Sequence, residues 1–185
     1  MNVLESFSLK GKVALVTGGA GLYGRQIVEA LAEAGAETYI ASRNLESLQQ
    51  VAKEEVERGH NVTAMKLDLS EDDSIENLHR DIIEKSGKCD ILINNAVSRE
   101  FGSAGWQNTL DDFDKSLRIN ASALFKITQL FSEDMKKNNS GSIINIGSMM
   151  GTVGVENGNY EGTDFTPATS PLYFYEKGGM HNFTR

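Results

Sequence analysis

The chain has 185 residues, of which 39% are hydrophobic and 24% are charged, and its formal net charge is -8 at pH 7. These values predict one soluble globular domain over residues 1–185, long enough to bury a core. The acidic balance argues against a nucleic-acid partner, and the absence of an apolar stretch of roughly 20 residues argues against a membrane span.

Segments typical of strands and segments typical of helices alternate along the chain. Apolar or β-branched runs predict strands over residues 13–16, 37–41, 62–67, 91–93 and 142–146. Between them, Asn44 can cap one helix, Ser70 with Asp73 resembles a capping box for another, and a long helix runs from about Leu110 to Lys137 with a break expected near Arg118. This alternation predicts an α/β fold, a doubly wound, Rossmann-like parallel sheet in three α/β/α layers.

The first predicted strand is followed by a glycine-rich turn, Gly19-Ala20-Gly21-Leu22-Tyr23-Gly24, and then by a helix. Strand, glycine turn and helix in this order are the dinucleotide-binding fingerprint. We expect Gly19 to make the tight turn, Gly21 to let the backbone approach a pyrophosphate, and Gly24 to let the helix pack close to the strand. The N–H groups at the start of the helix would then face the phosphates.

The end of the second predicted strand indicates which nicotinamide cofactor is bound. An NAD site places Asp or Glu there to hold the ribose 2′-hydroxyl, whereas this chain has Ser42 and Arg43. A guanidinium can bind a 2′-phosphate, so the sequence favours NADP, with NAD as the alternative. The competing interpretation is that Arg43 is an ordinary solvated surface residue.

Near the C-terminus, Tyr173 and Lys177 are four residues apart and would share one face of a helix. A lysine ammonium close to a phenol favours the phenolate, so such a tyrosine could exchange a proton with a carbonyl or alcohol oxygen. An ordinary surface pair is the alternative, because this spacing also occurs by chance.

With these residues assembled, the chain resembles the short-chain dehydrogenase/reductase family over its whole length. The resemblance implies cofactor contacts at the segments that match the family's motifs, and these are Thr17, Gly18, Gly19, Gly21, Leu22, Tyr23, Gly24, Ser42, Arg43, Asp68, Leu69, Asn95, Ala96, Tyr173 and Lys177. It implies a catalytic set of Asn120, Ser148, Tyr173 and Lys177. In that set Tyr173 is the general acid/base, Ser148 binds the substrate oxygen, Lys177 binds the nicotinamide ribose, and Asn120 holds a water of the proton relay.

The chain departs from the family pattern in several places. Its glycine spacing, with Leu22 at the usual middle glycine, matches the family's extended branch of sugar-nucleotide epimerases and dehydratases, although the later motifs are of the classical type. The gap from Ser148 to Tyr173 is about twice the usual one and contains a polar segment, which favours a sugar or sugar acid as substrate. Glu176 stands before Lys177 where a small residue is common, and need not pair with it because neighbouring helical residues point to different faces. Family chains also continue for several tens of residues, so we expect the last strands and the substrate loop to be missing.

The sequence therefore predicts an NAD(P)-dependent oxidoreductase that transfers a hydride between the cofactor and a carbonyl or secondary alcohol. The alternatives are a truncated cofactor-binding module with little catalysis, and a sugar-nucleotide epimerase or dehydratase. No metal site is expected, and the resemblance implies a homodimer or homotetramer. The single cysteine, Cys89, and the lack of a signal peptide predict a cytoplasmic protein.

Overall fold

The structure is a computed structural model, and it describes residues 2–102, 104–154, 156–164 and 171–185. The contacts between residues divide the chain into two compact units. Unit 1 comprises Met1–Ala96 and Leu124–Ile144, and unit 2 comprises Val97–Ala123 and Asn145–Arg185. The glycine-rich turn belongs to unit 1, and the Tyr173–Lys177 pair belongs to unit 2.

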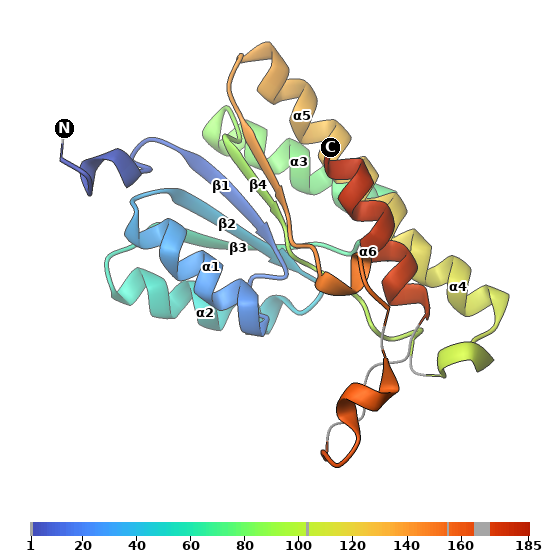
Figure 1. The fold of residues 1–185 in the computed structure, drawn as a ribbon. Helices are drawn as coiled ribbons and strands as arrows, with labels where there is room; N and C mark the ends of the chain where they lie inside the picture. Colours follow the sequence, from blue (N-terminus) through green and yellow to red (C-terminus); the bar gives the residue numbers. More distant parts are fainter. Residues whose placement is uncertain (1, 103, 155, 165–170) are drawn as a thin grey trace. The chain divides into compact units, whose positions relative to one another are not determined.

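Unit 1 is built on a five-stranded sheet with the strand order β3-β2-β1-β4-β5 (Figure 1). The strands are β1 (Val13–Thr17), β2 (Glu37–Ser42), β3 (Val62–Lys66), β4 (Ile91–Asn94) and β5 (Ser142–Asn145). Strand β1 pairs in parallel with β2 and with β4, and β2 pairs in parallel with β3. All five residues of β1 are buried, as expected for a central strand covered on both faces. The predicted α/β class with a Rossmann-like parallel sheet is confirmed.

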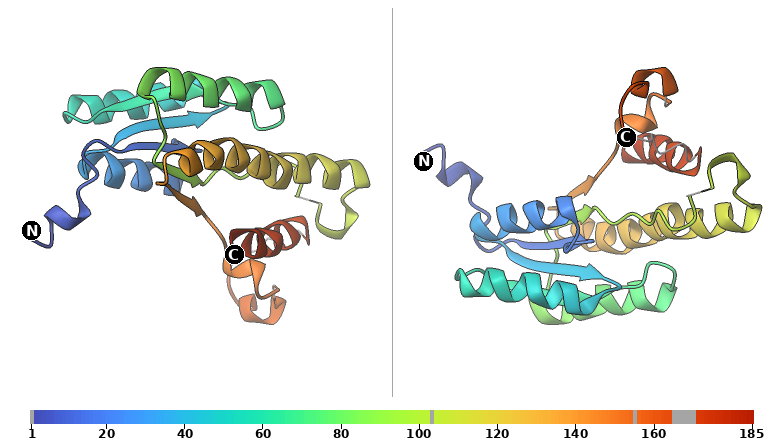
Figure 2. Two further views of the ribbon diagram at one scale, coloured as in Figure 1. Left: turned by 90° about the horizontal axis from the view of Figure 1, so that it is seen from above. Right: turned by 90° about the horizontal axis from the view of Figure 1, so that it is seen from below.

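The helices of unit 1 follow from this strand order. Right-handed crossovers place α1 (Leu22–Glu33) and α2 (Leu45–Glu57) on one face of the sheet. After β3 the next strand, β4, is added on the opposite side of β1, so the order of strands runs the other way. The same crossover rule then places α3 (Asp72–Ser86) and α5 (Ala123–Lys137) on the other face of the sheet. Helix α1 lies along β1 and β2 (Figure 2). Helices α3 and α5 are joined by a hydrogen bond of 2.6 Å between His79 Nε2 and Asp134 Oδ2.

Two predicted helix starts have different outcomes. Asn44 caps α2 as expected, because its side-chain oxygen accepts a hydrogen bond of 3.1 Å from the main-chain N–H of Ser47. The capping box predicted for α3 is wrong, since Glu71 occupies the cap position and makes no side-chain capping bond. Ser70 instead donates its hydroxyl hydrogen to Asp68 Oδ1 at 2.7 Å, so a nearer carboxylate takes the hydroxyl group.

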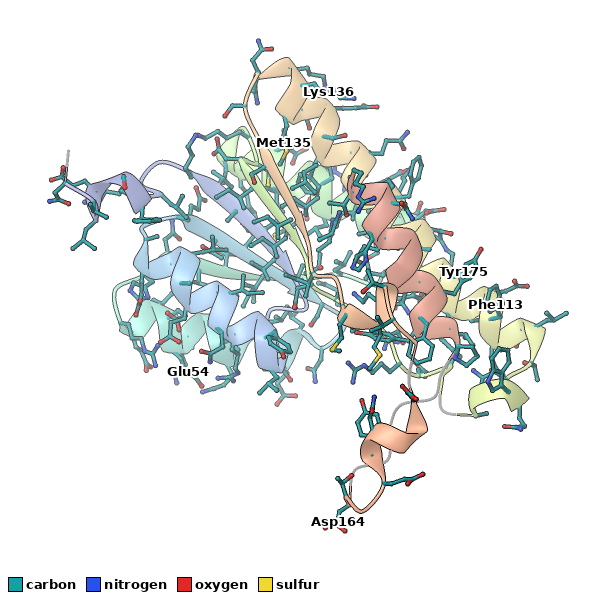
Figure 3. All side chains as sticks on the ribbon, in the orientation of Figure 1. Glu54, Phe113, Met135, Lys136, Asp164 and Tyr175 are labelled. Atoms are coloured by element: carbon teal, nitrogen blue, oxygen red, sulfur yellow. The ribbon has the colours of Figure 1, made fainter. Side chains whose placement is uncertain are left out.

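Unit 2 consists mainly of α4 (Leu110–Leu117), a π-helical turn η3 (Arg118–Ser122) and α6 (Pro171–Thr184). The short 3-10 helices η2 (Gly105–Gln107), η4 (Met149–Gly151) and η5 (Asn157–Tyr160) also belong to it, whereas η1 (Glu5–Phe7) belongs to unit 1. The break expected near Arg118 is confirmed. Helices α4 and α6 pack together through Phe113 and Tyr175, whose ring centroids are 5.5 Å apart (Figure 3).

Three further features are the single cysteine, the apolarity of the helices and the loop after Gly151. Cys89 is a buried thiol, and burial raises its pKa to about 12, which makes it chemically inert at neutral pH. None of the helices in the described ranges is long and apolar enough to cross a membrane. Part of the loop expected between Gly151 and Thr169 lies outside the described residues, and its described part contains η5.

Candidate active site

The glycine-rich turn after β1 is too closely packed for side chains at three of its positions, Gly18, Gly19 and Gly24. Gly18 has a positive φ of 70°, and a Cβ atom added to it would lie 3.1 Å from the Cα atom of Ala96. A Cβ atom on Gly24, in the first turn of α1, would run into the carbonyl oxygen of Gly18. The close packing predicted for Gly24 is therefore what the structure has.

The role predicted for Gly19 needs correction. The left-handed residue of the turn is Gly18, and Gly19 is instead required by space, because a Cβ atom there would lie 2.8 Å from Cβ of Ile40. Gly21 is the cap residue of α1, with an extended backbone and no side-chain capping bond. Leu22 and Tyr23 follow it with exposed side chains. The start of α1 thus presents main-chain N–H groups and exposed side chains, which is suitable for an anion such as a pyrophosphate.

Thr17 joins the glycine turn to the loop after β4. Its Oγ1 atom accepts hydrogen bonds from the main-chain N–H groups of Asn95 (3.1 Å) and Ala96 (3.0 Å). In return, the side-chain amide of Asn95 donates to the carbonyl oxygens of Thr17 (3.0 Å) and Gly18 (3.2 Å). Four of the predicted cofactor residues are therefore held together at the carboxyl ends of β1 and β4.

Charged side chains gather at the carboxyl ends of β2 and β3. Arg43 follows β2, and Lys66 at the end of β3 donates a hydrogen bond of 2.6 Å to the carbonyl oxygen of Arg43. Asp68 has its pKa lowered, first by the hydroxyl of Ser70 and then by that residue's main-chain N–H, with smaller contributions from Arg43 and Lys66. The sequence analysis did not identify Lys66 as a site residue. The alternation of strands and helices could have pointed to it, because consecutive parallel strands such as β2 and β3 usually lie side by side.

Two further predicted residues border this group. Ser42 is half-buried and pairs in the sheet with Lys66. Leu69 is half-buried directly after Asp68. The predicted cofactor residues of unit 1 thus all lie where the parallel strands end, at the edge of the sheet where ligands of open α/β folds bind.

In unit 2, Tyr173 and Lys177 lie one turn apart on α6, and Lys177 Nζ is 5.8 Å from the centroid of the Tyr173 ring. Lys177 is only 4% exposed, and this burial lowers the pKa of its ammonium group. Its Nζ atom donates a hydrogen bond of 2.6 Å to the carbonyl oxygen of Ile146, just after β5. The lysine is therefore fixed in position with its charge held close to the tyrosine ring.

Ser148 lies in the turn that leads from β5 into η4, where its Oγ atom accepts a hydrogen bond of 3.2 Å from the main-chain N–H of Met150. This turn packs against α6 without intervening side chains, because a Cβ atom on Gly151 would lie 2.7 Å from the carbonyl oxygen of Lys177. The structure therefore places the Ser148 turn directly against the helix that carries Tyr173 and Lys177.

Asn120 is buried in the π-helical turn η3, and both ends of its side-chain amide bond to protein groups. Its Oδ1 atom accepts from the main-chain N–H of Ser98 at 2.8 Å, and its Nδ2 atom donates to the carbonyl oxygen of Ser98 at 2.9 Å and to Glu176 Oε2 at 3.0 Å. π-Helical turns are frequent at functional sites because they disturb the main-chain hydrogen-bond ladder. The protein therefore fixes the orientation of the Asn120 side chain from both ends of its amide.

The sequence reasoning missed two charged residues beside the predicted catalytic group. Glu176 is buried and accepts hydrogen bonds from Ser116 and Asn120. From sequence it stands out only as a departure from the small residue that is common before the lysine. Arg99, in the loop after β4, has its guanidinium carbon 5.4 Å from the centroid of the Tyr173 ring. Neither could have been found from local spacing, because their partners are distant in sequence.

Known proteins resemble this chain in sequence. The sequence profile of the family described as short chain dehydrogenase matches residues 12–162. The 2-dehydro-3-deoxy-D-gluconate 5-dehydrogenase of Bacillus subtilis is 36% identical over 152 residues, which cover 79% of this chain and 56% of that protein. The chain thus spans little more than half the length of this relative.

Solved structures show the same similarity. A gluconate 5-dehydrogenase from Burkholderia cenocepacia, in complex with NADP and tartrate, has a TM-score of 0.82 and 26% identity, covering 99% of this chain and 67% of that one. An NAD+-bound xylitol dehydrogenase has a TM-score of 0.81 and 28% identity, covering 95% of this chain and 63% of that one.

Replacing Thr17 by Val should destabilise the protein, because Val keeps the shape of Thr but removes the oxygen that accepts from the N–H groups of Asn95 and Ala96. The half-buried N–H of Ala96 then loses its acceptor, whereas that of Asn95 keeps the carbonyl oxygen of Ile93. We expect the free energy of unfolding to fall by about 2 kcal/mol. Thr17→Ser keeps the hydroxyl oxygen and is the matched control, with a smaller loss from one deleted methyl group. Urea unfolding followed by circular dichroism measures both. Equal losses in the two variants would show that the methyl group, rather than the hydroxyl, matters.

Proposed function

Since the chain belongs to the short-chain dehydrogenase family, we propose that it is a nicotinamide-dependent oxidoreductase acting on a carbonyl or secondary alcohol. The observation that carries the proposal is the Tyr173–Lys177 pair of α6, with the buried ammonium 5.8 Å from the centre of the phenol ring. A phenol beside a fixed cation can give up and take back a proton at working pH. This is the acid–base chemistry that interconversion of a ketone and an alcohol requires.

Unit 1 has features that fit a dinucleotide. Glycine at positions 18 and 24 lets the turn and the start of α1 pack closely, and the cap residue Gly21 places no side chain over the N–H groups of α1. These features suit a pyrophosphate, which combines negative charge with several hydrogen-bond acceptors. Asp68, Leu69, Asn95 and Ala96 would surround the adenosine part. The bound cofactor would supply the hydride chemistry, while the chain binds it and handles the proton.

The residues of unit 2 would divide the remaining work among them. Tyr173 would donate a proton to the substrate oxygen during reduction and accept one during oxidation. Ser148 would donate a hydrogen bond to the same oxygen, and Lys177 would bind the nicotinamide ribose while stabilising the phenolate. Asn120 would position the turn of main chain that holds a relay water. Each role is the one that the family's motif gives to the matching residue of this chain.

We infer a preference for NADP over NAD. Arg43 follows β2, where an NAD site would place a carboxylate, and Lys66 adds a second cation at the neighbouring end of β3. Two cations attract a 2′-phosphate, and the guanidinium can bind it through two hydrogen bonds. One similar solved structure holds NADP and another holds NAD+, so the preference for NADP rests on the positive charges of Arg43 and Lys66.

We further infer that the substrate is a sugar acid. Arg99 is exposed and its guanidinium lies over the Tyr173 ring, where it can bind a carboxylate on the molecule whose oxygen Tyr173 protonates. The relatives named for gluconate derivatives, one of them with tartrate bound, agree with an acidic substrate. The epimerase alternative rests on glycine spacing alone, and the low-activity module rests on length alone. Assembly as a homodimer or homotetramer and a cytoplasmic location stay predictions.

Replacing Arg43 by Ala should weaken NADPH binding by at least about tenfold, because the 2′-phosphate loses a charge-assisted partner. NADH has no 2′-phosphate, so its affinity should change by less than about twofold. Titrations followed by nucleotide fluorescence measure both constants. Arg58→Ala, which removes another exposed arginine of unit 1, is the control. Equal losses for NADPH and NADH would remove the proposed role of Arg43.

Replacing Tyr173 by Phe should lower kcat by about a thousandfold or more, because the ring remains but the proton donor is lost. NADPH affinity should stay within about threefold of the wild type, since most of the cofactor contacts remain. Tyr175→Phe is the matched control, because Tyr175 lies on the same helix and is largely exposed. Turnover by Tyr173→Phe close to that of the control would overturn the assignment.

Replacing Arg99 by Gln should raise KM for acidic substrates by about tenfold or more, because a carboxylate loses its cationic partner. Steady-state kinetics with gluconate and with the neutral polyol xylitol separate charge recognition from general damage. The KM for xylitol should change little. Activity confined to neutral polyols, or an equal rise in KM for both, would contradict the proposal of an acidic substrate.

A further inference from the structure

The buried carboxylate of Glu176 connects the two elements of unit 2 that carry predicted catalytic residues. It lies on α6 directly before Lys177, yet it points toward α4 and η3 rather than toward the lysine. Its Oε1 atom accepts a hydrogen bond of 2.5 Å from the hydroxyl of Ser116, and its Oε2 atom accepts one of 3.0 Å from Nδ2 of Asn120. The side chain is buried, with the residue only 7% exposed.

Both neighbours act as hydrogen-bond donors, so Glu176 serves as an acceptor at both oxygens. An ionised carboxylate is an acceptor only, and this arrangement satisfies both of its oxygens. Burial raises the pKa of Glu176, while the hydrogen bonds from Ser116 and Asn120 and the charge of Lys177 act against that rise. A carboxylate held by donors of this kind is the form expected at alkaline pH.

Lys177, a cation, is the residue that follows this buried anion on α6. Among the described residues, Glu176 favours the ammonium form of Lys177 and Arg99 disfavours it, and His181 lies one turn further along α6. Burial itself disfavours the ammonium form and is the largest effect. The protein therefore buries a functional cation and places a fixed anion one residue away, where the helix prevents the two from forming a direct pair.

We propose that Glu176 is a positioning residue that acts through Asn120 and Lys177. Its carboxylate ties α6 to the π-helical turn through Asn120 and places a negative charge one residue away from the buried Lys177. The proposal rests on the proposed function, because it assigns Lys177 to the nicotinamide ribose. Its consequence is that loss of the Glu176 charge makes the lysine lose its proton at lower pH, and cofactor binding that depends on the ammonium group fails at lower pH.

The test is the pH dependence of NADPH affinity, measured by nucleotide fluorescence between pH 7 and pH 10 in the full chain. All variants are made in a Tyr173→Phe background, so that titration of this phenol does not contribute. Glu176→Gln keeps the size of the side chain and removes the charge. At pH 9 we expect it to bind NADPH about fivefold more weakly than the parent, with a difference below about twofold at pH 7.

Two further variants separate charge from structure. Ser116→Ala removes one hydrogen bond to the carboxylate but keeps its charge, so its pH profile should follow that of the parent. Arg99→Gln removes the opposing cation, so its alkaline loss of affinity should begin at higher pH. The pH at which NADPH affinity is lost should therefore rise in Arg99→Gln and fall in Glu176→Gln. Loosened packing would not move it in opposite directions in the two variants.

The outcomes distinguish this inference from the proposed function. If the parent binds neither NADPH nor NADH, both fall together. If the parent binds NADPH but the Glu176→Gln profile coincides with it, or Ser116→Ala shifts the profile equally, the inference alone falls. If Glu176→Gln does not fold, Glu176→Asp, which keeps the charge, is compared with Glu176→Ala. The Asp profile must then lie nearer to the parent, and a coincidence of the two would overturn the inference.

Discussion

The constraint on which unit 1 depends is the contact between the first turn of α1 and the glycine turn after β1. Any side chain at Gly24 would run into the carbonyl oxygen of Gly18, so the helix can start this close to the sheet only with glycine there. Because the helix starts so close, its first N–H groups lie at the carboxyl ends of the parallel strands. Thr17 then fixes the loop after β4 against the same turn through its hydroxyl oxygen. Steric exclusion thus sets the position, and hydrogen bonds hold it.

In unit 2 the main constraint is different, because polar side chains are held in fixed positions inside the protein. Buried polar groups cost free energy unless they are paired, and buried charges cost more. Asn120 is satisfied at both ends of its amide, Lys177 donates to a carbonyl oxygen, and Glu176 accepts at both oxygens. The three residues come from two helical elements, so the network also fixes those elements relative to each other. This rigidity is what an acid–base pair needs to keep its geometry.

Much of this arrangement could be predicted from sequence because it depends on local rules. Strand periodicity, the Asn44 cap and the break near Arg118 involve residues within a few positions of each other, and all were found. Gly18 and Gly19 were confused because both sit in the same turn, and only backbone angles show which one is left-handed. The Ser70 hydroxyl suits a helix cap by local pattern, but the Asp68 carboxylate two residues earlier is a stronger acceptor and takes it instead. Glu176 and Arg99 could not be interpreted, since the Ser116 and Tyr173 partners are 60 and more residues away in sequence.

The buried lysine shows why an unusual neighbour does not break the motif. Consecutive residues of a helix differ by about 100° in direction, so Glu176 and Lys177 face different surroundings although they are adjacent in the chain. The carboxylate can therefore bind Ser116 and Asn120 without drawing the ammonium away from the carbonyl oxygen of Ile146. Both residues are buried, and Coulomb interactions between buried charges are weakly screened, so the charge of Glu176 favours the ammonium form of Lys177. Geometry separates the hydrogen bonds of the two residues, while electrostatics couples their charges.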